Sequence, residues 1–430
     1  MIYFWILVYN LIVVPIGFIG FNLLALVNKK ARAGVRGRIK SRVDLLNFIR
    51  KKSSRRETFL VHSASLGEFE QAKPVIRGLK ALRPDILIVA SFTSPSGFEN
   101  AERMTEVDHY TYLPLDTYIG MRIFLHKIKP SKIIFVSYEL WPNLLFLAIR
   151  YNIKTYLISA RLRNIEFKSK PLLKSIMKTL YEMINNIYAI SEKDERAFKN
   201  ILGINKIRVL TLGDTRYDQV IERAKRRIKF NVKKIFDDGF VLICGSIWPQ
   251  DARFLFPAIK GVMDKFDNFR VIIAPHEPTE YAIEMVRDWF SQYDIRVQTY
   301  TSLNGVSDSK VVVIDTIGLL AELYHQSNVA FIGGSFRGSI HNVMEPAVAG
   351  NPVIFGPYYK NSREAEQLLE VGGAFCCTNE SEIYSLIFKF IVDEDFFLKS
   401  SKAASDFILN NLGASTKTVK EILELNENNN

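Results

Sequence analysis

Hydrophobic and polar positions divide the 430-residue chain into an apolar leader and a long alternating body. No charged residue occurs between Ile2 and Val27, and a helix of these residues would be roughly 39 Å long, enough to cross a bilayer. Behind the leader, short apolar runs rich in β-branched residues alternate with helical patterns. Such a series is typical of parallel strands that are covered by helices on both faces of a sheet.

Two series of apolar runs predict two doubly wound α/β domains. The first series consists of Phe59–His62, Ile86–Ser91, Lys132–Val136, Thr155–Ser159 and Ile187–Ile190, and a further strand, Val209–Leu212, is predicted near the hinge. The second consists of Phe240–Cys244, Arg270–Ala274, Val311–Ile314, Val329–Ile332 and Val353–Phe355. A charged stretch, Val220–Gly239, separates them. We therefore predict a transmembrane anchor at 1–28, a basic segment at 29–56, and Rossmann-like domains at 57–225 and 226–430 that face each other across a cleft.

The formal net charge of +12 is concentrated directly behind the apolar leader. Residues 29–56 hold 12 Lys or Arg and one acid, Asp44, whereas the rest of the chain has 45 basic and 44 acidic residues. A polybasic stretch beside an apolar helix is attracted to anionic lipid headgroups. We therefore expect a membrane surface, and not nucleic acid, as the partner of this charge, with the body of the protein on the cytoplasmic side.

The leader has two alternative interpretations. It lacks a basic region ahead of its apolar run, which argues against a cleaved signal peptide. Tyr3, Trp5 and Tyr9 lie near one end, as aromatic residues do at a membrane interface. A helix that re-enters the membrane or lies along its surface remains the second alternative to a spanning anchor.

Polar motifs follow the predicted strands of the first domain, where the carboxyl ends of parallel strands form a binding edge. The segment His62–Phe69 (HSASLGEF) opens a helix with Glu68 in its first turn. The helix dipole there keeps a carboxylate ionised and able to accept a proton. Ordinary capping by Ser65 and Glu68 is the competing interpretation. The segment Ser91–Gly97 offers hydroxyl and backbone N–H groups to a sugar or phosphate, or else makes an ordinary turn.

Two further motifs belong to the first domain. In Glu139–Asn143 (ELWPN), the Trp face can stack on a sugar while the carboxylate binds hydroxyls. The alternative is a helix start with Pro in the first turn. Arg216 follows the run Val209–Leu212 and can meet a phosphate or a carboxylate, or can be a solvated charge.

The second domain carries a pattern that indicates a nucleotide-sugar donor. Gly333, Gly334 and Ser335 follow an apolar run, and glycines let the chain pass close to a phosphate. Glu345, about one helical turn after Asn342, can accept both hydroxyls of a ribose. A turn followed by a helix cap is the alternative. Other polar strand ends are Gly245–Pro249, Pro275–Glu277 and Asp315–Gly318.

Signals for other chemistries are absent from the sequence. It contains no Walker A lysine loop, no GxSxG and no HExxH. Cys244, Cys376 and Cys377 show no zinc-ligand spacing, and the adjacent pair is expected to fill a strand. The D-x-D triplet Asp393–Asp395 lies in a helical pattern and not after a strand. We therefore expect no metal site and no cofactor.

Taken together, the motifs resemble those of the Kdo (3-deoxy-D-manno-octulosonic acid) transferases, inverting enzymes of the GT-B fold that use CMP-Kdo. The resemblance rests on SASLGE, ELWPN, GGS, HNxxEP and Gly356-Pro357, which occur in this order between about residues 57 and 375. It implies metal-independent transfer of Kdo to a hydroxyl of a lipid A precursor in lipopolysaccharide biosynthesis. The expected location is the inner membrane, with its anionic lipids.

The resemblance also implies roles for individual residues. Glu68 matches the proposed base that takes the proton of the acceptor hydroxyl, and Glu139 and Arg216 match positions that stabilise the transition state. Adding the glycine-rich turn to the stretches that line CMP gives a predicted donor site of Pro275, His276, Ile317, Gly318, Leu319, Gly334, Ser335, Asn342 and Glu345.

The chain departs from the family pattern at several of these positions. Arg216 stands where many members have Lys, and His276 stands where Arg is common. Leu319 replaces a frequent Glu, and the stretch Gly245–Asp251 lacks the usual His-Glu pair. Two other functions therefore remain open: a GT-B lipid glycosyltransferase that uses a UDP-sugar, and an inactive membrane scaffold that binds lipid through Lys29–Arg56.

Overall fold

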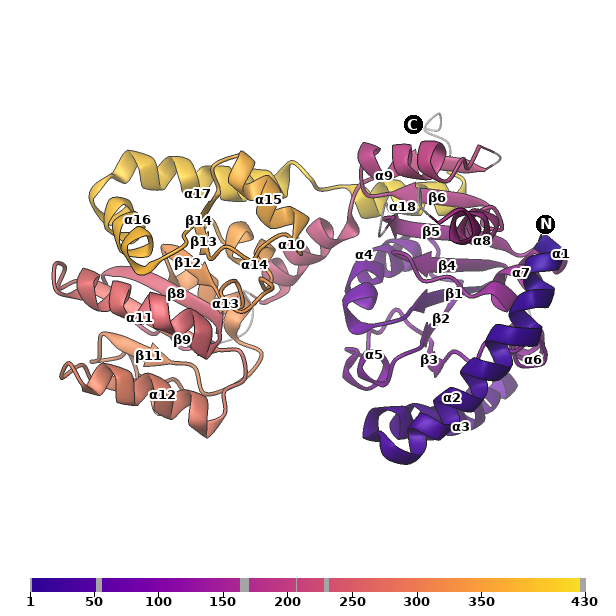
Figure 1. Cartoon of the computed structure of the whole chain (residues 1–430), viewed down its shortest axis with the longest axis horizontal. Helices are drawn as coiled ribbons and strands as arrows, with labels where there is room; N and C mark the ends of the chain where they lie inside the picture. Colours follow the sequence, from indigo (N-terminus) through magenta and orange to yellow (C-terminus); the bar gives the residue numbers. More distant parts are fainter. Residues whose placement is uncertain (1, 52–55, 163–169, 206, 228–231, 426–430) are drawn as a thin grey trace. The chain divides into compact units, whose positions relative to one another are not determined.

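The computed structural model describes residues 2–51, 56–162, 170–205, 207–227 and 232–425. The chain divides into two compact units, one of residues 1–219 with 412–430 and the other of residues 220–411. Among the described residues, the strands form two seven-stranded parallel sheets, one in each unit (Figure 1). The prediction of two doubly wound α/β domains is confirmed.

The first sheet has the strand order β3-β2-β1-β4-β5-β6-β7. Its strands are β1 (Thr58–Ser63), β2 (Leu87–Phe92), β3 (His109–Tyr112), β4 (Lys132–Val136), β5 (Lys154–Ala160), β6 (Asn186–Ala189) and β7 (Arg208–Thr211). His62 pairs in register with Ser91 of β2 and Phe135 of β4, so the motifs that follow these strands begin at one edge of the sheet. Alternate residues of β1 enter different cores, because Phe59 and Val61 pack in one cluster and Leu60 in another.

Helices cover both faces of this sheet. The body helices of the unit are α4 (Leu66–Leu82), α5 (Pro95–Asn100), α6 (Tyr118–Ile128), α7 (Pro142–Arg150), α8 (Pro171–Tyr181), α9 (Glu192–Arg196), the π-helix Ala197–Ile201, α10 (Thr215–Arg227), which continues into the second unit, and α18 (Ala414–Leu423).

The second sheet has the order β10-β11-β9-β8-β12-β13-β14. Its strands are β8 (Phe240–Ile247), β9 (Phe269–Pro275), β10 (Val297–Thr299), β11 (Val311–Val313), β12 (Val329–Ile332), β13 (Val353–Phe355) and β14 (Ala374–Cys376). Its helices are α11 (Pro249–Met263), α12 (Glu280–Ser291), α13 (Leu320–Leu323), the 3-10 turn Tyr324–Gln326, α14 (Met344–Val348), α15 (Arg363–Glu370), α16 (Glu380–Val392) and α17 (Glu394–Leu409).

The C-terminal helix corrects the predicted domain limits. Residues 412–430 belong with the first unit and not, as predicted for all of 226–430, with the second domain. Val419 of α18 packs in the core cluster of α4, and a Cβ on Gly78 of α4 would lie 2.8 Å from the Val419 side chain. Asp218 holds the start of α18 by accepting from the backbone N–H of Gly413 and Ser415 at 2.7 Å each.

The apolar leader is one continuous helical segment of α1 (Ile2–Val8), the π-turn Tyr9–Val13 and α2 (Val14–Val27). By length and composition, Ile2–Val27 can cross a membrane. The basic segment that follows forms the helix α3 (Lys29–Lys51), which packs along β3 (Figure 1). Ser41 of α3 accepts from the backbone N–H of Tyr112, so this helix covers the edge of the sheet. Residues 52–55 and the polar tail 426–430 lie outside the described residues.

Candidate active site

Glu68 lies in the first turn of α4 and is only 5% exposed. Its carboxylate accepts from the backbone N–H groups of Ala64 and Ser65 and completes a capping box, so the capping interpretation is confirmed. Both N–H groups donate to the same carboxylate oxygen, Oε2. Capping and proton acceptance are therefore compatible in this residue.

Glu139 lies beyond the carboxyl end of β4, close enough to Glu68 for their charges to interact. Burial, and secondarily the charge of Glu68, raise the pKa of Glu139 to about 7. A carboxyl group with a pKa near neutrality is well suited to exchange a proton or to respond to charge in a reaction. Just before it, Ser137 has a left-handed backbone (φ 68°), a strained conformation that is often found at active sites.

His62 connects the two carboxylate motifs. It is 1% exposed, and burial lowers its pKa to about 3, so the imidazole is neutral. Trp141 Nε1–H donates to His62 Nε2 at 3.0 Å, and Nδ1 lies 2.9 Å from Ser91 Oγ. Because an indole N–H can only donate, the imidazole proton is assigned to Nδ1. His62 thus holds the Trp141 ring of the ELWPN motif, a role that the sequence did not predict.

A second polar network supports the ELWPN motif. Asp116 caps α7 by accepting from the backbone N–H of Asn143 at 3.0 Å and of Leu144 at 3.2 Å. Asn143 is fully buried and exchanges hydrogen bonds with Asn10 of the leader, at 2.7 and 3.0 Å. The predicted helix start with Pro142 in the first turn is confirmed. The apolar leader is therefore attached to the helix that begins in this motif.

Arg216 is not a freely solvated charge. Its guanidinium donates to the Asp214 carboxylate at 2.6 and 2.9 Å, and its side chain is 26% exposed. The adjacent Thr215 donates to the carbonyl of Gln71, one turn beyond Glu68 in α4. The start of α10 is thus held by the helix that carries Glu68, while Asp214 partly neutralises the cation.

In the second unit, an aromatic stack lies at the carboxyl edge of the sheet. The Trp248 ring stacks on His276 (4.4 Å between centroids), and His276 stacks on His341 (4.5 Å). Trp248 Nε1–H donates to His341 Nε2 at 3.0 Å, and the Arg337 guanidinium lies 3.6 Å from the Trp248 ring centroid. Burial, with the nearby His276 and Arg337, lowers the pKa of His341 to about 4. His276, which stands where the family commonly has Arg, is therefore part of an aromatic platform.

Asp251 organises the glycine-rich turn and was missed by sequence reasoning. Its fully buried carboxylate accepts from the backbone N–H of Trp248 (3.0 Å), Gly334 (2.7 Å) and Phe336 (3.0 Å). Burial raises its pKa. Asp251 lies in the first turn of α11, directly after a strand. An acidic residue at such a position is a helix-capping signal in the sequence, and this signal could have identified Asp251.

Two predicted donor residues are buried in this turn. Ser335 is fully buried; its hydroxyl donates to the carbonyl of Ile332 and accepts from the backbone N–H of Gly356. Gly334 has φ 81°, and a Cβ there would lie 2.3 Å from the carbonyl oxygen of Ser339. The N–H of Gly334 and the hydroxyl of Ser335 are already bonded inside the protein, so these groups shape the turn and do not present free donors to a phosphate.

The other predicted donor residues lie nearer the surface. His276, Ile317, Gly318 and Asn342 are exposed, and Pro275, Leu319 and Glu345 are partly exposed. The Oδ1 atom of Asn342 accepts from the backbone N–H of Met344 at 2.9 Å. Glu345 Oε1 accepts from Arg223 at 2.8 Å, so one carboxylate oxygen already has a cationic partner.

The D-x-D triplet is structural in the folded chain. The Asp393 side chain caps α17 by accepting from the backbone N–H of Phe396. Within the described part of the chain, no group of three or more His, Cys, Asp or Glu side chains could hold a metal ion. Cys376 lies in β14 and Cys377 directly follows it.

Comparison with known proteins shows similarity to one family of transferases. Residues 37–219 match the family model described as 3-deoxy-D-manno-octulosonic-acid transferase (kdotransferase). The 3-deoxy-D-manno-octulosonic acid transferase of Rickettsia prowazekii is 26% identical over 339 residues, which cover 76% of this chain and 70% of that protein. The Aquifex aeolicus enzyme of the same name is 27% identical over 330 residues, covering 75% and 83%.

Solved structures support the fold. UDP-GlcNAc 2-epimerase from Neisseria meningitidis, bound to UDP-GlcNAc, superposes with a TM-score of 0.63 at 15% identity, covering 85% of this chain and 100% of that chain. Two parallel seven-stranded sheets and this structural likeness define the GT-B fold, as predicted from the sequence. The chain is therefore similar to the Kdo transferases over about three quarters of its length.

Proposed function

We propose that this protein transfers Kdo from CMP-Kdo to a hydroxyl of a lipid A precursor, with inversion at C2 of the sugar. The observation that carries the proposal is the interaction between the charges of Glu68 and Glu139 at the carboxyl edge of the first sheet. The acceptor oxygen forms a bond to C2 while the bond from C2 to the CMP phosphate breaks. Glu68 accepts the hydroxyl proton, and CMP leaves as an anion.

The remaining predicted residues have supporting roles in this proposal. Glu139, once ionised, stabilises the positive charge that develops on the sugar ring as CMP departs. Arg216, held by Asp214, provides a cation near the start of α10. The Trp248–His276–His341 stack offers a platform for the cytosine base, and Asn342 with Glu345 offers polar groups to the ribose. We propose that transfer requires no metal, as the family resemblance implies.

A direct assay tests this function. Full-length protein in detergent is incubated with CMP-Kdo, a tetraacylated lipid A precursor and EDTA, and the products are analysed by mass spectrometry. We expect a lipid that is heavier by one or more Kdo units. Turnover of UDP-sugars in place of CMP-Kdo would support the alternative enzyme. Absence of binding to any nucleotide would support the inactive scaffold.

We also propose that the leader attaches the protein to the inner membrane and lies along its cytoplasmic surface. The helix is held on the first unit at two points along its length, by the Asn10–Asn143 pair and by Arg38, which lies 5.2 Å from the Phe21 ring centroid. Arg38 itself donates to the carbonyls of Thr93 and Leu113 in the body. The outer face of the leader helix is apolar and exposed, as at Leu11, Ile16 and Leu26. Attachment at two separate points along the helix favours the surface alternative over a spanning anchor.

Cysteine labelling distinguishes these two orientations. Tyr3→Cys and Val27→Cys replace side chains that are 73% and 82% exposed, near the two ends of the helix. We expect both variants to react with a membrane-impermeant maleimide from the cytoplasmic face of sealed inner-membrane vesicles. The unmodified chain, with its three native cysteines, provides the background. Labelling of Tyr3→Cys only from the opposite face would establish a spanning helix.

A further inference from the structure

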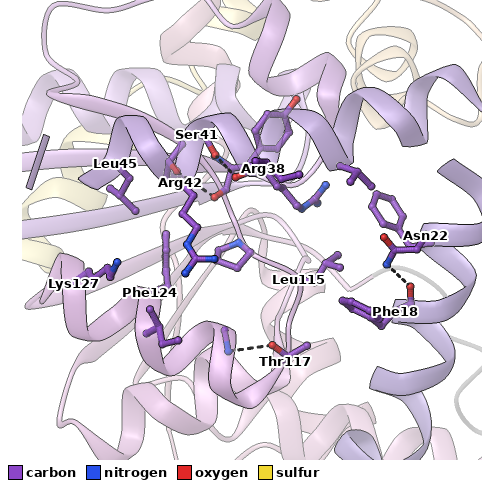
Figure 2. A pocket seen from close by; sticks show the side chains of 18 residues that line it. Phe18, Asn22, Arg38, Ser41, Arg42, Leu45, Leu115, Thr117, Phe124 and Lys127 are labelled. Carbon is purple, nitrogen blue, oxygen red and sulfur yellow. Dashed lines mark hydrogen bonds between the residues drawn. The ribbon is translucent and has the colours of Figure 1, made fainter. Parts of the chain in front are cut away.

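A cavity of about 480 Å³ lies in the first unit, between the leader hairpin of α2 and α3 and the segment that runs from β3 into α6 (Figure 2). Its walls are mainly apolar, with Phe18 and Phe21 from α2, Leu45 from α3, and Leu115 and Phe124 from the opposite side. This volume is within the range of roughly 300–1,000 Å³ that is typical of ligand pockets. The cavity therefore has room for a lipid chain.

Basic side chains accompany the apolar walls. Arg38, Arg42 and Lys127 line the cavity, and Figure 2 shows Arg42 reaching from α3 toward its interior. Arg38 is engaged with backbone carbonyls. Arg42 and Lys127 have no hydrogen-bond or ion-pair partner among the residues that the structure describes. An apolar space beside two unpaired cations is complementary to an acyl chain whose lipid carries a phosphate.

The cavity is connected to the candidate catalytic residues through direct contacts. The Arg38 guanidinium donates to the carbonyl of Thr93 at 2.9 Å, and Thr93 Oγ1 lies 3.4 Å from His62 Nε2. His62 in turn accepts the indole N–H of Trp141, two residues beyond Glu139. The cavity therefore lies at the same edge of the sheet as the carboxylate pair.

We propose that this cavity holds one acyl chain of the acceptor lipid, with a phosphate of that lipid bound by Arg42 and Lys127. This inference rests on the proposed function, because it assigns the acceptor of that reaction. The apolar chain would be transferred from the bilayer to the cavity along α2, whose outer face is exposed and apolar. The sugar part of the lipid then extends toward Glu68.

Filling the cavity tests the acyl-chain site. Ile123 lines it from α6 and is 41% exposed, so Ile123→Trp adds bulk at a tolerant position. We expect the KM for the tetraacylated acceptor in detergent to rise at least about tenfold, the effect of one or two methylenes in an apolar pocket. The KM for the same phosphorylated sugar without acyl chains should not change. Ile119→Trp, on the same helix, 70% exposed and outside the cavity, is the matched control.

Charge removal tests the phosphate site. Arg42→Ala should raise the KM for the phosphorylated acceptor several-fold, and Arg42→Lys should restore most of the affinity because it restores the charge. Lys40→Ala, an exposed position of the same helix that does not line the cavity, is the control. Equal KM values for Arg42→Ala and Lys40→Ala would overturn the phosphate assignment.

Three outcomes separate the inference from the proposed function. If the wild type transfers sugar and Ile123→Trp behaves like Ile119→Trp, the acyl-chain site is wrong and the function stands. If both cavity variants bind phosphatidylglycerol vesicles more weakly with unchanged KM in detergent, the occupant is a bilayer lipid and the inference is overturned. If the wild type transfers nothing, binding of the tetraacylated precursor in the absence of donor still tests the acyl-chain site. Ile123→Trp must then weaken this binding, and unchanged binding would overturn the inference.

Discussion

Glu68→Gln lowers the rate of sugar transfer by about 10²–10⁴-fold, the usual contribution of general acid–base catalysis. The neutral amide cannot take the proton of the acceptor hydroxyl. Its carbonyl oxygen can still accept from the backbone N–H groups of Ala64 and Ser65, which Glu68 now caps. We therefore expect near-normal thermal unfolding, measured by circular dichroism, beside a large loss in the initial rate at saturating substrates.

Comparison of two substitutions separates catalysis from capping. Glu68→Ala removes the capping acceptor as well, and should lower the free energy of unfolding by about 0.5–2 kcal/mol. Glu70→Gln is the control for the loss of one negative charge in the same helix, where the Glu70 carboxylate is paired to Lys73. Transfer by Glu68→Gln close to the wild-type rate would reassign the base, and Glu139 would be the next candidate.

The rate of transfer rises with pH through an apparent pKa of about 7, the second large effect that we expect. Burial and the charge of Glu68 raise the pKa of Glu139 to this value, so its carboxyl group is neutral below pH 7 and ionised above it. Only the ionised form stabilises the cationic sugar of the transition state. Glu139→Gln should lower the rate at pH 8 by about 10²-fold and abolish the rise, because such electrostatic groups contribute roughly that much.

The same titration has the opposite effect on stability. A carboxyl group whose pKa is raised by folding binds its proton more tightly in the folded state, so its contribution is complete below pH 4.5 and is lost as the pH rises through 7. Melting temperatures should therefore fall over this window more in the wild type than in Glu139→Gln.

Glu68→Gln should move the activity rise to lower pH, because it removes a negative charge beside Glu139. A profile that is flat from pH 6 to 8 would refute the role of Glu139.

The central strands of both sheets could be predicted from the sequence, whereas two edge strands could not. β1 and β8 are covered on both faces and each contains an apolar run, Phe59–Val61 and Phe240–Cys244, that is visible without the fold. β3 and β10 are edge strands with a mixed sequence, His109–Tyr112 and Val297–Thr299, that shows no such run. Their pairing depends on neighbours that are distant in sequence.

The sequence by itself determined the fold class, the apolar leader and the motifs at the strand ends, because parallel strands buried on both faces impose a local pattern of residues. Only the tertiary structure decided which polar groups are already bonded. It places Glu68 beside Glu139, assigns Ser335 to the interior of a turn, and joins Asn10 to Asn143 across 133 positions of the chain. Burial, shared hydrogen bonds and shifted pKa values arise from contacts between distant segments, and no local pattern of residues encodes them.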